Sequence, residues 1–224
     1  MTTIKPITLY TSATPNGRKI SIALEELGFE YNVKNIDLGK NEQKEDWFLA
    51  INPNGRIPAI VDHSANDLSI FESGAILMYL AEKAGRLLPK EPKKRYAVLQ
   101  WLFFQMSALG PMQGQANVFY RYLDNSIPLA TQRYQRETLR LYGVVNKQLS
   151  QQTYLAGEFS IADIAAYPWI KIASWGGLLT DEFLHIQRWL SVLDERDSFK
   201  RGLSVPEKIR NKDLLNMGKS IIVT

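Results

Sequence analysis

The chain has 224 residues, of which 45% are hydrophobic and 22% charged, and it contains no cysteine. This composition is typical of a folded globular protein and excludes wholesale disorder, while the length admits one large domain or two small ones. The missing cysteine excludes disulfides, thiolate-bound metals and a protein thiol nucleophile. The two histidines, His63 and His185, lie far apart in the sequence, so we expect no metal site. No apolar run approaches the ~20 residues that span a bilayer, so we expect a cytoplasmic protein with no membrane partner.

The charge is unevenly distributed, with −2 over residues 1–92 and +6 over the remainder. No run of Lys and Arg exceeds three residues, so we expect no nucleic-acid partner. A stretch rich in proline and lysine at 88–94 separates two apolar-periodic segments and is typical of a linker. We therefore predict four parts: a first domain at 1–86, a linker at 87–94, a second domain at 95–210 and a tail at 211–224. The tail either packs back on the body or frays.

Short β-rich runs and helical periods alternate in the first domain. We predict, in chain order, a strand at 7–10, a helix from about 16 to Gly28, a strand at 31–36, a short helix at 46–50, hairpin strands at 57–61 and 68–71, and a helix at 72–83. The resulting order, β-α-β-α-β-β-α, indicates an α/β domain.

The second domain has no convincing strand. We predict long helices at about 95–110, 127–150, 161–175 and 185–195, and the tryptophans in this half indicate a well-filled helical bundle. Residues 159–164 (FSIADI) form the pattern of an N-capping box with a hydrophobic staple. In this pattern Ser160 caps the helix and Asp163 reaches back to it. We assign both residues to folding and not to catalysis.

Two helix starts in the first domain offer chemistry, because a helix N-terminus has unpaired backbone N–H groups and a partial positive charge. At the first, Thr14 or Asn16 can aim a side chain at a ligand, although an ordinary capped turn is the simpler interpretation of the local sequence. At the second, Ser73 offers a hydroxyl to a carboxylate and Glu72 a carboxylate to an ammonium group. Together these two groups suit the ends of an α-amino acid.

The proline of Ile57-Pro58 falls inside a predicted strand, where it removes a ladder donor. A cis peptide bond would turn the chain and free the backbone of Ile57 to pair with a peptide ligand. Only about 5–6% of X–Pro bonds in folded proteins are cis, so the dipeptide alone does not predict this geometry.

These features together resemble the cytosolic glutathione transferases over about residues 7–205. The resemblance implies a thioredoxin-like N-terminal domain followed by an all-α domain, and a structural role for Pro58. Several motifs are similar to the nu-class enzymes of bacteria and to fungal relatives of yeast's nitrogen-catabolite regulator. These motifs are Thr14-Pro15-Asn16-Gly17, Leu38-Gly39-Lys40, residues 52–60 (NPNGRIPAI), residues 71–76 (FESGAI) and Leu109-Gly110-Pro111-Met112.

The resemblance implies a glutathione site. In such enzymes the residue matching Asn16 contacts glutathione, and the residue matching Thr14 lies near its sulfur. The backbone of Ile57 would pair with the cysteinyl unit, while Glu72 and Ser73 would hold the γ-glutamyl end.

For two further residues the match to glutathione-binding residues of these enzymes is less specific. Gln43 matches a glutamine that approaches the glycine carboxylate. Arg133 matches an arginine that reaches the ligand from the helical domain, although Arg136 and Arg140 on the same helix compete for that assignment. A Tyr or Ser near the end of the first strand serves other transferases, which makes Tyr10 and Ser12 candidates by position, but for Tyr10 we favour core packing.

The expected function is that of a glutathione-dependent disulfide-bond oxidoreductase. In this reaction the thiolate of bound glutathione, held by Thr14 and Asn16, attacks a disulfide substrate. The resemblance implies glutathione or glutathione disulfide as co-substrate, no metal, and a homodimer. One alternative is conjugation of glutathione to electrophiles, or reduction of organic hydroperoxides, with aromatic residues such as Phe104 and Trp175 lining an apolar second site. A second alternative is a non-catalytic binding or regulatory module on the same fold.

Overall fold

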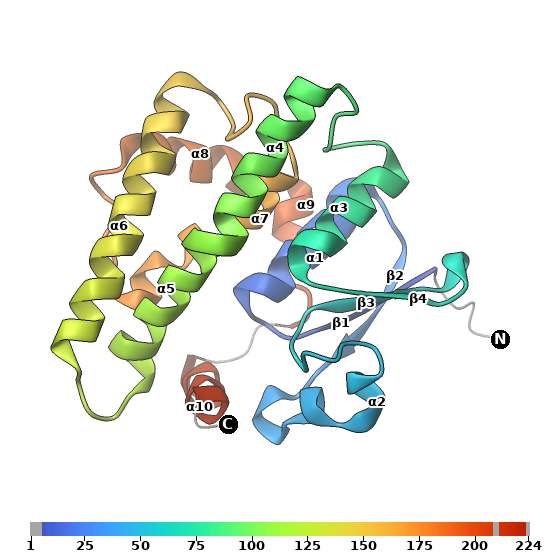
Figure 1. The fold of residues 1–224 in the computed structure, drawn as a ribbon, viewed down its shortest axis with the longest axis horizontal. Coiled ribbons are helices and arrows are strands. Elements are labelled where there is room, and N and C mark those ends of the chain that lie inside the picture. The colour runs from blue at the N-terminus through green and yellow to red at the C-terminus, as the bar shows by residue number, and fades with distance from the viewer. Residues whose placement is uncertain (1–5, 208–210, 223–224) are drawn as a thin grey trace.

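The computed structural model describes residues 6–207 and 211–222, which form an N-terminal half built on a sheet and a C-terminal half of helices (Figure 1). The first half has the predicted order β-α-β-α-β-β-α. Its elements are β1 (Ile7–Thr11), α1 (Pro15–Leu27), β2 (Tyr31–Asn35), α2 (Asp46–Leu49), β3 (Ala59–Asp62), β4 (Leu68–Phe71) and α3 (Ser73–Ala84), with short 3-10 turns η1 (Leu38–Lys40), η2 (Glu42–Lys44) and η3 (His63–Ala65).

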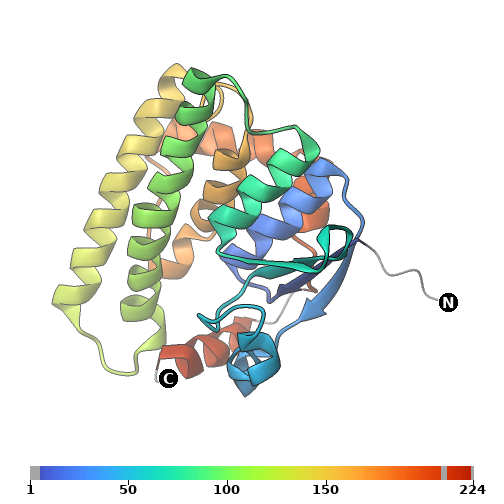
Figure 2. The same cartoon turned by 45° about the vertical axis from the view of Figure 1, so that its right-hand side comes forward.

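The four strands form one mixed sheet in the order β2-β1-β3-β4. β1 runs parallel to β2 and antiparallel to β3, and β3 runs antiparallel to β4. Because side chains alternate along a strand, Ile7 and Leu9 face α1 and α3, while Tyr10 packs toward α2 with Trp47 and Phe48. Both views place α1 and α3 between the sheet and the helical half (Figure 2).

The hairpin differs from the prediction at its start. The peptide bond between Ile57 and Pro58 is cis, and β3 begins at Ala59, so the prediction that Ile57 and Pro58 lie inside the strand is wrong. The reason is that proline has no backbone N–H to give to a ladder. Ile57 therefore remains in the loop that leads into the sheet.

The C-terminal half contains helices where the sequence predicts them and one long helical stretch that it does not predict. Its elements are α4 (Pro92–Phe104), η4 (Gln105–Leu109), α5 (Gly110–Asn117), η5 (Val118–Tyr122), α6 (Pro128–Gln151), α7 (Ile161–Lys171), η6 (Ala173–Gly176), α8 (Leu184–Asp194), α9 (Asp197–Gly202) and α10 (Asn211–Ile222). α4 begins three residues inside the stretch predicted as a linker.

The helix predicted to end at Gly110 continues instead to Tyr122. A π-helical turn, η4, precedes Gly110, and Pro111 then occupies the first turn of α5, where a missing N–H costs little. Local sequence rules predict that a helix ends at Gly-Pro, but the wide π turn allows the helix to continue across these two residues.

The capping box at the start of α7 is present as predicted. Ser160 Oγ accepts a hydrogen bond from the Ala162 N–H at 3.3 Å, and Asp163 Oδ2 accepts one from the Ser160 N–H at 3.0 Å. Asp163 is completely buried, and its Oδ1 also accepts from the Leu155 N–H at 3.0 Å and from the Trp189 indole at 2.9 Å. The box therefore also connects α7 to the preceding loop and to α8.

The tail packs back on the body as helix α10, which lies against η1 of the first half and η5 of the second. Gly218 lies so close to Tyr122 that an added Cβ would come within 2.3 Å of its ring, and Lys219 forms an ion pair with Asp124. Residues 223–224 of the predicted tail lie outside the described residues. No helix among the described residues is both long and apolar enough to cross a bilayer.

Candidate functional site

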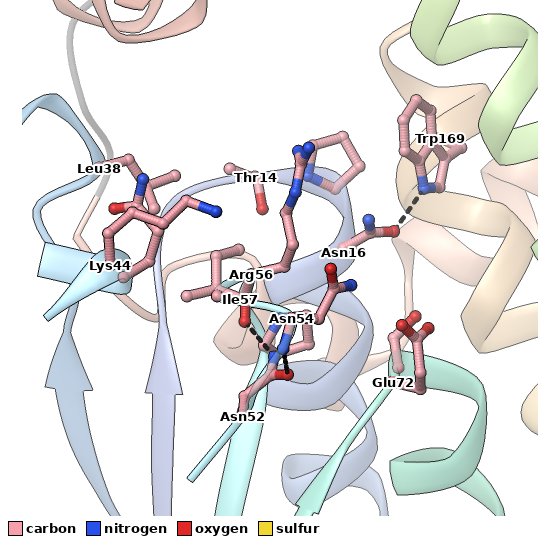
Figure 3. A pocket seen from close by; sticks show the side chains of 15 residues that line it. Thr14, Asn16, Leu38, Lys44, Asn52, Asn54, Arg56, Ile57, Glu72 and Trp169 are labelled. Atoms are coloured by element: carbon pink, nitrogen blue, oxygen red, sulfur yellow. Dashed lines mark hydrogen bonds between the residues drawn. The ribbon is translucent and has the colours of Figure 1, made fainter. Parts of the chain in front are cut away.

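A cavity of about 540 Å³ opens where the first turns of α1 and α3 meet the loop that leads into β3 (Figure 3). This volume falls in the range of small-molecule sites. The lining residues come from both halves of the chain: Thr14, Pro15, Asn16, Leu38, Gln43, Lys44, Asn52, Asn54, Gly55, Arg56, Ile57, Pro58, Glu72, Ser73 and Trp169. All the predicted glutathione-binding residues except Arg133 are therefore at one place.

The first turn of α1 forms one wall. Thr14 is the N-cap, and its Oγ1 accepts a hydrogen bond from the Gly17 N–H at 3.2 Å. Gly17 leaves no room for a side chain, because a Cβ there would lie 2.3 Å from the Ser12 carbonyl oxygen. The start of α1 is thus pressed against the end of β1, and the helix N-terminus, with its unpaired N–H groups and partial positive charge, borders the cavity.

Trp169 of α7 holds the side chain of Asn16. Its indole N–H donates to Asn16 Oδ1 at 2.9 Å, as Figure 3 shows. With its oxygen engaged in this way, the carboxamide has its NH₂ group free for a ligand. Sequence reasoning assigned Trp169 to the bundle core and missed this contact, because no local pattern connects two residues 153 positions apart.

Glu72 and Ser73 form the opposite wall. Glu72 immediately precedes α3 with φ 69° and ψ 116°, an unfavourable conformation for a residue with a side chain, and it lies exposed on the cavity. Such conformations cost about 1–3 kcal/mol and cluster at functional sites. Ser73 is buried in the first turn of α3. The prediction that the helix includes Glu72 is off by one residue, since Glu72 occupies the N-cap.

Gln43 is buried, with 4% of its surface exposed, and its Nε2 donates to Asn41 Oδ1 at 3.2 Å. Its Oε1 has no hydrogen-bond partner among the described residues. An orphaned buried polar atom on a cavity wall indicates that a ligand or water completes the site. Two exposed cations at the same rim, Lys44 and Arg56, were not predicted from the sequence and suit an anionic ligand.

Three residues considered from the sequence do not line the cavity. Arg133 is exposed on α6 near Glu137, where the hydrogen bond from Arg140 lowers the pKa of the Glu137 carboxyl and the charge of Arg133 adds to this shift. Its contact with a ligand stays a prediction. Tyr10 is half-buried against α2, where burial raises its pKa, and Ser12 is buried behind the turn. The packing role favoured for Tyr10 agrees with this position.

One polar residue behind the cavity wall was not singled out from the sequence. Lys19 of α1 is buried directly behind Ser73, and its Nζ donates to Ser73 Oγ at 3.3 Å. The helical period of α1 places this position on the face that packs against α3 and α7, where a lysine is exceptional. A charged residue at a position that the helical period places on the buried face is a signal that the sequence alone contains.

Family models of the glutathione S-transferase N-terminal and C-terminal domains match residues 5–82 and 129–197 of this chain. The chain is 53% identical over 170 residues to the disulfide-bond oxidoreductase YfcG of Escherichia coli K12, covering 74% of this chain and 79% of that relative. It is 41% identical over 212 residues to the disulfide-bond oxidoreductase YghU of the same strain, covering 88% and 74%.

Solved structures agree with these matches. The glutathione transferase URE2P6 from Phanerochaete chrysosporium, in complex with oxidized glutathione, has a TM-score of 0.86 and 38% sequence identity to this chain. The match covers 92% of this chain and 98% of that one. Both halves of the chain are therefore similar, in sequence and in structure, to the same group of proteins.

Proposed function

Because this chain belongs to the glutathione S-transferase family, in its nu-like and Ure2-like subgroup, we propose that it is a glutathione-dependent thiol–disulfide oxidoreductase. The observation that carries the proposal is the cavity where the first turns of α1 and α3 meet, in a chain that has no cysteine. The two Escherichia coli relatives, both disulfide-bond oxidoreductases, support it.

The residues on the cavity wall fit the polar groups of glutathione from one end to the other. The Glu72 carboxylate suits the γ-glutamyl ammonium group, and the Ser73 hydroxyl with the first N–H groups of α3 suits the adjacent carboxylate. The backbone of Ile57, which lies ahead of the β3 ladder, suits the cysteinyl peptide unit. At the other end Gln43, with its unpartnered oxygen, and Lys44 suit the glycine carboxylate.

The sulfur would then lie near the first turn of α1. There the Thr14 hydroxyl, the Asn16 carboxamide and the helix N-terminus all favour the thiolate over the thiol, so they lower the thiol pKa below its usual ~8.5. Bound glutathione supplies the thiolate, which exchanges with a disulfide through a mixed disulfide. The chain binds and orients this borrowed thiol and stabilises its thiolate, while the thiol proton is released to solvent.

The aromatic side chains that could form an apolar electrophile site lie in the helical half, away from the cavity at α1 and α3. Phe119 stacks on Tyr134 with ring centroids 5.3 Å apart, and the Trp175 indole donates to Tyr122 Oη at 2.8 Å. Phe104 packs edge-on against Trp101. None of these rings lines the cavity at α1 and α3, although Phe104 and Trp101 line a separate cavity between α4 and α6. An apolar electrophile would therefore lie away from the proposed position of the sulfur.

The test compares two substrates at a fixed glutathione concentration. We expect kcat/KM for a small hydroxyalkyl disulfide to exceed that for a chlorodinitrobenzene-type electrophile by about tenfold or more, which corresponds to about 1.4 kcal/mol of transition-state stabilisation. The reverse ratio would assign the chain to conjugation. Calorimetric titration with glutathione is the control, since an absence of binding would revive the non-catalytic module.

We also propose that the protein is a homodimer, with the partner copy covering apolar side chains on α4 and on the edge strand β4. Tyr96 and Phe103 of α4 are 63% and 57% exposed, and Phe71 at the end of β4 is 37% exposed. Large exposed apolar groups on an edge strand and on a helix are typical of a covered interface. The family resemblance implies a second copy as the occupant.

Introducing a charge at this face should break the dimer. We expect Phe103→Glu to weaken association by about a hundredfold, because a hot-spot aromatic contributes about 2 kcal/mol or more and the new carboxylate would be buried unpaired. The molar mass measured by size-exclusion chromatography with light scattering should then fall from twice 25.5 kDa toward 25.5 kDa. Leu184→Glu on α8, where the leucine is 72% exposed, is the matched control and should remain dimeric. A monomeric wild type would contradict the proposal.

The proposed chemistry suits the cytoplasm. A reductase that borrows its thiol needs a reducing glutathione pool, which cytosolic compartments supply and oxidising compartments do not. The chain itself has no cysteine that such a pool would need to protect. We therefore propose a cytoplasmic location, which fractionation of the native host would test.

A further inference from the structure

Lys19 is a buried cation in α1 without a carboxylate partner. Only 1% of its surface is exposed, and its Nζ donates to Gln105 Oε1 at 2.6 Å and to Ser73 Oγ at 3.3 Å, with Met106 Sδ at 3.8 Å. Within residues 6–207 and 211–222 it forms no ion pair. Burying an unpaired ammonium group costs free energy. Its position beside the cavity wall therefore indicates that an anion bound in the cavity would stabilise it.

The groups around Lys19 are mostly neutral. Burial lowers the pKa of Lys19 to about 7, and the negative charge of Glu72 opposes this shift. Arg18, the neighbouring cation, is engaged elsewhere, since its Nη1 donates to the Pro206 carbonyl oxygen at 2.6 Å. The buried carboxyl of α7, Asp163, is held in its capping box. Lys19 is therefore partly protonated near neutral pH, and Glu72 is the charge that favours its protonated form.

Ser73 joins Lys19 to the cavity. Its hydroxyl accepts from Lys19 and donates its own proton to Met106 Sδ at 3.6 Å, which is a weak acceptor. A carboxylate in the cavity is a much better acceptor, so it would take this proton in place of the sulfur. A hydroxyl that accepts from an ammonium group is also polarised into a stronger donor.

Gln105 fixes the ammonium group from the other side. Its Oε1 faces Lys19 although its own Nε2, also buried, has no hydrogen-bond partner among the described residues. Leaving that donor unsatisfied costs free energy, which the short hydrogen bond to Lys19 offsets when the lysine is charged. The residue lies in the π turn η4, so the helical half of the chain contributes directly to the charge behind Ser73.

We propose that Lys19 is a positioning residue for the γ-glutamyl carboxylate of glutathione: acting through the Ser73 hydroxyl, its ammonium group stabilises the bound carboxylate and takes up a proton as the carboxylate arrives. This proposal rests on the proposed glutathione function and deepens it. By linkage, a carboxylate that binds better to charged Lys19 must raise the affinity of Lys19 for its proton. Ligand binding is thus coupled to protonation at a site that the ligand does not touch.

The test uses S-methylglutathione, whose sulfur cannot ionise, as the calorimetric probe of the full-length protein. In two buffers of different ionisation enthalpy, the wild type is expected to take up a fraction of one proton per bound ligand near pH 7.5. Its dissociation constant should rise by up to about tenfold per pH unit above about pH 7. Lys19→Met should bind about tenfold or more weakly, with no proton uptake and a flat pH profile.

Gln105→Glu is the matched variant that preserves the fold, because it places a carboxylate on Lys19 without changing side-chain size. It should keep Lys19 charged before binding and so abolish proton uptake while binding persists. A probe with 4-aminobutanoyl in place of γ-glutamyl lacks the carboxylate and should bind the wild type without proton uptake.

The outcomes separate the two proposals. Binding of S-methylglutathione with no proton uptake, or with equal uptake in wild type and Lys19→Met, would overturn the role of Lys19 and leave the glutathione site intact. Absence of any binding to the wild type would overturn both, starting with the proposed function. A loss of affinity in Lys19→Met that retained the wild-type pH profile would indicate a merely structural role.

Discussion

Replacing Thr14 and Asn16 together by alanine is expected to lower glutathione-dependent disulfide reductase turnover by about a hundredfold or more. Both side chains line the cavity at the N-terminus of α1, where the sulfur is proposed to lie. Losing both donors would raise the thiol pKa, so less thiolate would be present at neutral pH. Turnover with a small disulfide, and the ultraviolet absorbance of the bound thiolate against pH, measure the two effects.

Two controls keep this result interpretable. Thr14 also caps α1, and its loss costs about 1 kcal/mol of stability, so thermal unfolding of the double variant must be measured beside its activity. Thr14→Ser retains both the cap and the hydroxyl and should remain within a few-fold of wild type. Unchanged turnover in a folded double variant would mean that neither side chain serves the thiolate.

Replacing Asp163 by alanine is expected to destabilise the fold by about 3–5 kcal/mol. The carboxylate is completely buried and accepts hydrogen bonds from the Ser160 and Leu155 N–H groups and from the Trp189 indole. Alanine would leave these three donors unsatisfied at the junction of α7, α8 and the loop before them. The midpoint of urea unfolding measures the loss.

Ser160→Ala is the matched control, because it removes the cap of the same helix and leaves Asp163 in place. It should cost only about 1 kcal/mol. If the two variants lost equal stability, the buried carboxylate would contribute nothing beyond capping.

Asp163 should also make the free energy of unfolding depend on pH. Burial raises the pKa of Asp163 to about 6, and the hydrogen bonds it accepts only partly oppose this shift. Because the folded pKa lies above the unfolded value of about 3.9, the stability that this group contributes is complete below pH ~4 and is lost as the pH rises through about 6. The difference in unfolding free energy between wild type and Asp163→Asn should therefore fall over that range, and a difference that rose would contradict the direction of the shift.

Much of the fold follows from patterns that act over three or four residues. The alternation in β1, the cap at Thr14 and the box at Ser160–Asp163 are each complete within one turn or one strand, so periodicity and capping rules find them. The long helix through Gly110 was not predicted, because the π turn that accommodates Pro111 depends on packing that no local rule contains.

The site divides in the same way. The sequence by itself determined that any sulfur chemistry must use a thiol from outside the chain, and it predicted two helix starts as candidate ligand-binding positions. Only the tertiary structure decided which distant residues support them: Trp169 holds Asn16 across 153 positions, and Gln105 meets Lys19 across 86. Such contacts depend on how two halves of the chain pack, and a hydrophobic pattern records only that a face is buried and not which polar group it meets there.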